Sequence, residues 1–321
     1  MSDAVDVVIA WVDGNDPKLR NKRLKFIEAG SHRGAEATRF ENLEEIYFCL
    51  RSIRKNAEWV NRIFIVTDRQ IPEALTILRG EDPCFAKKIR IVDHREIFEG
   101  FSEFLPTFNS ISIGSMLWRI PDLSERFIYF NDDVILCLKT ELTDFFDLLK
   151  PVYRGKWIGS WYEAVWFCKN LLWKMARRPA NDRRASFKDA QFLASKKVVG
   201  RCGFFSMGHT PHPALVSTFR MMFAENEALW RRNLVDRFRS FDQFSAFAAA
   251  RSYDLRHGRG IARKDLSLVF LRGEADAEYR VLEKCKMMED GRYLFGCLNG
   301  LDQLPEDLRE RVLTSLRRIV S

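Results

Sequence analysis

Long hydrophobic runs are missing from this chain of 321 residues. No apolar run approaches the roughly 20 residues that a membrane-spanning helix needs, so we expect no transmembrane helix. The stretch from Met1 to Val12 is apolar, but it contains Asp3 and Asp6 and no basic leader. This pattern argues against a secretory signal peptide, and we therefore expect a cytoplasmic protein.

Paired cysteine motifs are also missing. The chain has seven Cys residues, an odd number, and no two of them have a CxxC spacing. Most have apolar neighbours, as in Phe48-Cys49-Leu50 and Leu136-Cys137-Leu138. This usage predicts buried free thiols and argues against a zinc site.

Three short motifs of nucleotide-binding and hydrolytic enzymes are absent from the sequence, namely the Walker phosphate loop, the GxGxxG fingerprint and the GxSxG elbow. There is also no internal repeat and no linker. Any catalytic chemistry must therefore come from side chains that the fold brings together.

What the chain does contain is typical of a globular protein, because 46% of its residues are apolar and 13% are aromatic. Its first half alternates short β-rich runs with helical patterns. Strands are expected at 5–12, 62–67, 88–93 and 126–130, and helices at 17–29, 42–57, 72–79 and 109–119. This alternation predicts an α/β fold with a mostly parallel sheet and helices on both faces.

The second half looks mainly helical. Helices are expected at 157–175 and 305–320, and two more within 215–250, with one strand at 267–271. We therefore expect an α/β half, residues 1–150, and a mainly helical half, residues 151–321, that completes the active site and packs with the first as one unit.

Positive charge is concentrated in one segment. The net charge is +8, and Lys169 to Lys188 carries seven basic residues and one acidic residue. Such a segment can serve nucleic acid, anionic lipid or an anionic substrate, or it can be a solvated loop. The preceding helix, 157–175, has apolar residues on two sides, so it is either deeply buried or docks on a membrane or partner.

Carboxylates gather at two expected strand ends, where open parallel sheets place their active sites. Asp13 and Asp16 follow the first strand, and Asp132 and Asp133 follow the fourth. Adjacent carboxylates after an apolar strand suit Mg²⁺ or Mn²⁺. The alternative for either cluster is a turn or a helix N-cap.

A second group of candidates comes from the later part of the chain. His209 and His212 lie three residues apart between prolines, and Arg239 belongs to a local basic and acidic cluster. Histidine is the usual general base near neutral pH, although a structural turn is the alternative for this pair. Arg39 and Arg51 bracket an acidic stretch, for which a salt-bridged helix is the alternative.

Several blocks of the sequence resemble the conserved blocks of the Stealth family, which includes bacterial capsular-polysaccharide phosphotransferases. The resemblance rests on blocks that occur in the family's order: DVVIAWVDGNDP (6–17), RFENLEEIYFCLRSIRKNAEWVNRIFIVTDRQIP (39–72), IRIVDHREIF (89–98), LPTFNSISIGSMLWRIPDLSERFIYFNDDVIL (105–136), GHTPHP with RFRSFDQFSAF, and CLNGLD (297–302). Together they cover about half of the chain.

The resemblance implies a Rossmann-like fold similar to type-A glycosyltransferases. It also implies transfer of a sugar-1-phosphate from a nucleotide-diphosphate sugar to a glycan or lipid-linked glycan acceptor, in capsular or exopolysaccharide synthesis. The first half would then bind the nucleotide-sugar and Mg²⁺ or Mn²⁺. One departure is that Gly300 follows Asn299 where the family usually has Asp.

Carried over to this sequence, the family's pattern assigns three kinds of role. Asp132 and Asp133 are expected to hold the metal. His212, with His209 and Asp302 as alternatives, is expected to be the general base, with Arg239 as a phosphate clamp. Contacts with substrate are expected from Asp13, Asp16, Arg39, Asn109, Arg119 and Asn299.

Two other readings stay open. A conventional metal-dependent glycosyltransferase of the same fold would release a nucleoside diphosphate in place of the monophosphate. A nucleic-acid-binding module built on the basic segment is disfavoured, because that segment matches no recognised module, and we expect no nucleic-acid partner. Instead, the Trp-rich helix, the basic segment and the basic C-terminal helix lead us to expect a peripheral enzyme on the anionic inner membrane face.

Overall fold

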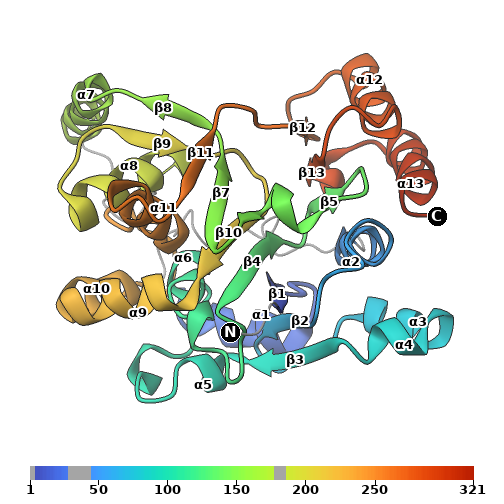
Figure 1. Ribbon diagram of the computed structural model, residues 1–321, viewed down its shortest axis with the longest axis horizontal. Helices are drawn as coiled ribbons and strands as arrows, with labels where there is room; N and C mark the ends of the chain where they lie inside the picture. Colours follow the sequence, from blue (N-terminus) through green and yellow to red (C-terminus); the bar gives the residue numbers. More distant parts are fainter. Residues whose placement is uncertain (1–3, 28–44, 177–185) are drawn as a thin grey trace.

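A five-stranded sheet lies at the centre of the molecule (Figure 1). The computed structural model describes residues 4–27, 45–176 and 186–321 of the chain. The sheet has the order β10-β4-β1-β2-β3, and all of its pairs are parallel except that between β10 and β4. Its strands are β1 (Val5–Ala10), β2 (Ile63–Thr67), β3 (Ile89–Asp93), β4 (Arg126–Asn131) and β10 (His212–Leu215).

Both faces of this sheet are buried, as a continuous apolar run in a parallel strand requires. Because side chains alternate along a strand, Val7 and Ile9 of β1 enter one hydrophobic core and Val8 enters another. The first core is shared with α2 (Glu45–Asn56), whereas the second includes residues of α8 (Phe187–Val199). The predicted α/β class with a mostly parallel sheet is confirmed.

The four strands of the first half begin and end within two residues of their predicted positions, and helices connect them. These helices are α1 (Pro17–Leu24), α2, α3 (Glu73–Glu81), α4 (Pro83–Ala86), α5 (His94–Ile97) and α6 (Ser110–Gly114). The predicted helix 109–119 was too long, since α6 ends at Gly114 and one 3₁₀ turn follows at Leu117–Arg119.

The second half contributes strands as well as helices. The smaller sheets have the orders β11-β7-β6, β12-β13-β5 and β8-β9. The first two of these sheets, together with the pairing of β10 with β4, join segments on both sides of residue 150. Their strands are β5 (Val134–Leu136), β6 (Phe146–Asp147), β7 (Lys150–Arg154), β8 (Lys156–Ile158), β9 (Phe204–Ser206), β11 (Ile261–Arg263), β12 (Leu268–Arg272) and β13 (Phe295–Asn299).

The helices of the second half depart from prediction in two places. The helix expected at 157–175 begins at Trp161, because residues 156–158 pair with β9 as β8. The segment 215–250 holds three helices where two were expected, because a loop separates α10 from α11. The helices are α7 (Trp161–Met175), α8, α9 (Val216–Glu225), α10 (Glu227–Leu234), α11 (Ala246–Arg256), α12 (Glu278–Glu289) and α13 (Glu306–Val320).

The two amphipathic helices expected from the sequence, α7 and α13, differ in how far other elements cover their apolar faces. The apolar face of α13 is buried in a core with α12 and β13, and Figure 1 shows α12 and α13 side by side. That face is therefore not available to a membrane, contrary to expectation. Helix α7 instead exposes most of its apolar side chains, and Leu172 and Met175 are 66% and 70% exposed.

The cysteines are free, as predicted, but they are not all buried. Cys49, Cys285 and Cys297 are buried, whereas Cys84 and Cys168 are exposed. The prediction failed for these two because Cys84 lies in the short helix α4 and Cys168 lies on α7 away from the core.

Candidate active site

A cavity of about 510 Å³ crosses the carboxyl ends of the central parallel strands. Trp11 follows β1, Asp68 follows β2 and His94 follows β3, and all three line this cavity. Asp132 and Asp133 line it after β4. The cavity therefore lies at the ends of the strands, where an active site is expected in this class of sheet.

Asp132 and Asp133 form the turn between β4 and β5. Burial raises the pKa of Asp132, and the charge of Asp133 raises it further. Burial also raises the pKa of Asp133, against the opposing effects of His209 and the Cys297 thiol. The thiol lies 3.5 Å from Asp133 Oδ2, and Asp133 Oδ1 is buried with no hydrogen-bond partner among the described residues.

These two neighbouring carboxylates fit a bound cation. The cation would offset the cost of burying their negative charges, and it would give the buried Oδ1 of Asp133 a partner. Within residues 4–27, 45–176 and 186–321, no group of three or more His, Cys, Asp or Glu side chains could hold a metal ion. A hard divalent ion needs no such group, because Mg²⁺ is commonly held by one or two carboxylates together with substrate phosphates and water.

His209 lies in the cavity beside this pair. Its ring is stacked between Phe187, at 4.3 Å between ring centroids, and Phe270, at 4.9 Å. Burial lowers the pKa of His209, the charge of Asp133 opposes that effect, and Arg239 adds to it. The imidazole is therefore neutral near pH 7, which is the form that accepts a proton.

Arg239 reaches the same cavity from a loop of the second half. Its Nε donates a hydrogen bond to Ser110 Oγ at 2.9 Å. The loop is held by the wholly buried Asn109, whose Nδ2 donates to Asp236 O, Phe238 O and Gln243 Oε1. Asn109 therefore positions the loop that carries Arg239, and it is not exposed to a substrate as the sequence prediction required.

His212, the first choice for the general base, lies elsewhere. It is the first residue of β10, paired with Tyr129 of β4, and its ring stacks on Tyr129 and Phe247. Burial lowers the pKa of His212 to about 3, helped by the charge of Arg251. The ring is thus a neutral part of the core, and the structure does not bring it to the cavity.

Asp13 and Asp16 hold a turn, which was the alternative for this pair. Asp16 accepts from Lys18 N at the start of α1, and Asp13 Oδ1 accepts from Asn15 N. Gln70 connects both, since its Nε2 donates to Asp13 O and to Asp16 Oδ2. These bonds lower the pKa of Asp16. Substrate contact by this pair is not supported.

Of two other predicted substrate contacts, only Arg119 lies in the described part of the chain, and it does not line the cavity. Arg119 donates to Ile97 O and Glu99 O and lies over the ring of Phe101, so it joins neighbouring segments of the first half. Arg39 lies outside the described residues.

The remaining two predicted residues do line the cavity. Asn299 ends β13, and its side chain lowers the pKa of Asp133 through a hydrogen bond. Asp302 accepts a hydrogen bond from Gln303 Nε2. Gly300 between them has φ +75°, a left-handed conformation that Gly adopts freely and that Asn and Asp tolerate better than other residues.

Sequence reasoning missed several polar residues of the cavity, among them Asp68, His94 and Tyr129. Burial lowers the pKa of His94 to about 4, although Asp68 and Asp93 favour its charged form. Asp68 pairs with Lys22 at 2.5 Å. The signal was available, because Asp68 and His94 directly follow β2 and β3 as Asp132 follows β4.

Residues 39–151 match Stealth protein conserved region 2, and residues 3–31 match Stealth protein conserved region 1. The chain belongs to the Stealth family. Region 2 contains Asp68, His94 and the Asp132–Asp133 pair, so the metal candidates lie in a part of the chain that defines the family.

Relatives of this Stealth protein include the receptor polysaccharide phosphotransferase WefC of Streptococcus oralis, 27% identical over 97% of this chain and 94% of WefC. The capsular polysaccharide phosphotransferase cps1A of Actinobacillus pleuropneumoniae is 40% identical over 44% of this chain and 38% of cps1A. The crystal structure of the galactosyltransferase LgtC, 12% identical, covers 97% of this chain and 95% of LgtC with a TM-score of 0.47, too low to add to the fold described above.

Proposed function

We propose that this protein transfers a sugar-1-phosphate from a nucleotide-diphosphate sugar to a hydroxyl group of a glycan acceptor, in the synthesis of a capsular or extracellular polysaccharide. The main support for the proposal is that one cavity at the carboxyl edge of the sheet is lined by Asp132, Asp133, His209 and Arg239. The phosphotransferase names of the relatives support the same reaction.

The reaction makes and breaks one bond to phosphorus. The acceptor oxygen bonds to the phosphorus nearer the sugar, the bond from that phosphorus to the bridging oxygen breaks, and a nucleoside monophosphate leaves with the electron pair. His209 takes the acceptor's proton on a ring nitrogen, since its lowered pKa keeps it neutral. Arg239 neutralises charge on the phosphate, and a hydrogen bond to Ser110 holds the guanidinium group of Arg239 in position.

We further propose that Asp132 and Asp133 hold Mg²⁺ or Mn²⁺, which would screen the charge of the two donor phosphates. The support is the unsatisfied Oδ1 of Asp133 and the raised pKa of both carboxyls. Asp132 and Asp133 would then orient the donor with its sugar-bearing phosphorus towards His209.

The product decides between this reaction and glycosyl transfer. We would incubate the enzyme with Mg²⁺ and a panel of UDP-, CDP- and GDP-sugars, together with candidate glycan acceptors, and identify the released nucleotide. We expect a nucleoside monophosphate and a glycan with one new phosphodiester. Release of a nucleoside diphosphate with a new glycosidic bond would replace the proposal with a conventional glycosyltransferase.

We also propose that the enzyme works at an anionic membrane surface. No described helix is long and apolar enough to cross a bilayer, so contact would be made by the exposed face of α7. Trp161, Phe167 and Leu172 are 60%, 60% and 66% exposed on that helix. Lys169 and Lys174 lie on the same helix, and each basic residue near an anionic surface contributes about 1 kcal/mol.

Vesicle sedimentation tests this second proposal. The protein should sediment with vesicles rich in phosphatidylglycerol at low salt and be released at high salt. Leu172→Ser should weaken binding. Tyr279→Ser on α12 should not, although Tyr279 is 65% exposed, as much as Leu172. Equal binding by both variants, or none by the original protein, would contradict docking through α7.

A further inference from the structure

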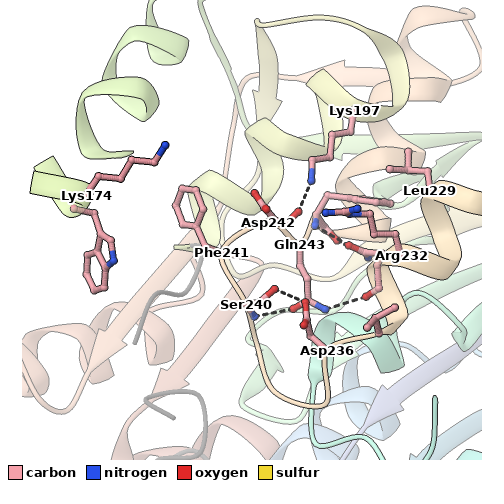
Figure 2. Close-up of a pocket in the computed structure, with 13 residues that line it drawn as sticks. Lys174, Lys197, Leu229, Arg232, Asp236, Ser240, Phe241, Asp242 and Gln243 are labelled. Atoms are coloured by element: carbon pink, nitrogen blue, oxygen red, sulfur yellow. Dashed lines mark hydrogen bonds between the residues drawn. The ribbon is translucent and has the colours of Figure 1, made fainter. Parts of the chain in front are cut away.

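A second cavity, of about 860 Å³, plays no part in the reaction proposed above. Residues of α7, α8, α10 and the loop 235–244 line it. In the view of Figure 2, Lys174 and Phe241 lie on one side of the cavity, and Leu229 and Arg232 on the other. Its volume is in the range of cavities that hold small organic ligands, roughly 300–1,000 Å³.

Aromatic rings form one wall of this second cavity. Trp173 and Phe241 are both half-buried there. Phe241 also stacks on Trp166, with ring centroids 5.5 Å apart and an angle of 18° between the planes, which fixes its orientation. Flat, fixed aromatic surfaces bury the C–H faces of sugar rings at low entropic cost.

Cations are crowded at the opposite wall. Lys197 is half-buried and donates to Asp242 O, as the dashed line in Figure 2 marks. Burial lowers the pKa of Lys197, and the nearby charge of Arg232 lowers it further, against the effect of Asp242. Asp236 accepts a hydrogen bond from Ser240 Oγ at 2.5 Å. Three cations, Lys174, Lys197 and Arg232, and two carboxylates, Asp236 and Asp242, line the cavity, so an anion bound beside Lys197 and Arg232 would meet a net positive charge.

The loop 235–244 contributes residues to both cavities. Arg239 lines the catalytic cavity, whereas the next residue, Ser240, lines the second one. Gln243 accepts hydrogen bonds from Asn109 and from Ser240 N, and these bonds hold the loop in place. A chain-like molecule that enters the second cavity therefore lies close to the phosphate that Arg239 would bind.

We propose that the second cavity binds a segment of the acceptor glycan beyond the hydroxyl that receives the phosphate, and that it prefers a segment already carrying a phosphodiester. The proposal rests on the proposed function, because repeated sugar-1-phosphate transfer leaves one negative charge at each joint of the product. Trp173 and Phe241 would bury sugar rings, and Lys197 and Arg232 would bind the phosphodiester. The enzyme would thereby favour an acceptor that it has already extended.

Binding of two matched probes to the full chain tests this site. One probe is a trimer of glucose units joined by 1→6 phosphodiesters, and the other is isomaltotriose, its neutral 1→6-linked counterpart. We expect the phosphodiester trimer to bind about tenfold more tightly by calorimetry, the gain of a charge-assisted hydrogen bond. Equal affinity for the two trimers, or no binding of either, would overturn the proposal.

Variants locate the binding and separate it from the reaction. Lys197→Gln should abolish the preference, whereas Lys196→Gln should not, because Lys196 pairs with Glu163. Trp173→Leu should weaken both trimers. If Arg239→Ala removes the preference and Lys197→Gln does not, the trimer binds in the catalytic cavity and the proposal fails. The measurement needs neither donor nor turnover, so a nucleoside diphosphate product would overturn only the proposed reaction.

Discussion

At the scale of single residues, the chemistry of the catalytic cavity depends on how each polar group is partnered. Asp133 has one oxygen beside the Cys297 thiol and one with no partner in the described part of the chain. His209 has both faces of its ring covered by Phe187 and Phe270, so its ring edge is what can meet a substrate. These two residues are therefore suited to binding a cation and moving a proton.

Asp133→Asn should lower turnover by about two orders of magnitude or more and leave the unfolding temperature in metal-free buffer unchanged or higher. The reason is that burial raises the pKa of Asp133, so its charge is unfavourable in the folded state at neutral pH without a cation. Steady-state kinetics and thermal melts with and without Mg²⁺ would measure both effects. Full activity of the original protein in excess EDTA would contradict a metal role.

His209→Ala and Arg239→Ala should differ in their pH profiles. Burial lowers the pKa of His209, so the original activity should fall as the pH drops below about 6.5 through that pKa. His209→Ala should lower turnover roughly 10²-fold and remove this acid limb. Arg239→Ala should lower activity at every pH and keep the limb, because Arg stays charged. An intact limb in folded His209→Ala would move the base to Asp302.

The sequence could predict Asp132 and Asp133 because two acidic residues after a recognisable buried strand have one natural position, at the carboxyl edge of the sheet. It could not separate His209 from His212. Both lie between prolines, and only the pairing of His212 with Tyr129, far away in the chain, buries its ring. For the same reason Asn109, which holds a loop more than a hundred residues away, was mistaken for a substrate contact.

At the scale of elements, β10 extends the central sheet with a strand that begins at a histidine. His212 is only 9% exposed, its Nδ1 has no partner in the described part of the chain, and two rings stack on it. A buried neutral histidine makes the fold sensitive to acid. The unfolded chain takes up a proton below about pH 6.5, whereas the folded chain resists it down to the pKa of about 3.

His212→Phe should therefore reduce the loss of stability in acid. Between pH 7 and pH 5 the original protein should lose about 2 kcal/mol of unfolding free energy through this residue, since its pKa is lower in the folded state. Phe can stack on Tyr129 and Phe247 without titrating. Urea melts of both proteins at the two pH values would measure the difference, and equal losses would contradict a buried, neutral His212.

Strands β1, β2 and β4 could be predicted because each is a short, mostly apolar run that is almost wholly buried. Strand β3 has a similar apolar pattern, although it lies at the edge of the sheet and is mostly half-buried. Elements of the second half were harder to predict, because they depend on distant partners. Strand β8 is a strand only by pairing with β9, and β13 only by pairing with β12 and β5. Helix α11 begins at a side-chain cap, Ser245, which the sequence alone does not distinguish from other serines.

At the scale of the whole molecule, segments on the two sides of residue 150 complete each other's sheets. Strand β10 covers the edge of β4, and β13 pairs with β5. The catalytic cavity likewise takes Asp133 from one side and His209 and Arg239 from the other. Neither part could lose its partner without exposing a sheet edge and apolar core.

We therefore expect the chain to unfold in one cooperative transition. Far-ultraviolet circular dichroism and tryptophan fluorescence should give the same midpoint in urea, because both parts share sheets and cores. Two separated transitions would show that the parts are independently stable. Mg²⁺ at about 100 times its Kd should add about 2.7 kcal/mol to the single unfolding free energy.

The exposed thiol of Cys168 on α7 offers a reporter without any added residue. Replacement of Cys84, the other exposed thiol, by Ser would leave Cys168 as the most reactive position for a polarity-sensitive maleimide dye. The dye would lie among Val165, Leu171 and Leu172. Its emission should shift to the blue if α7 docks on added vesicles, and the dose of lipid that produces the shift would measure the affinity of α7 for the vesicle surface.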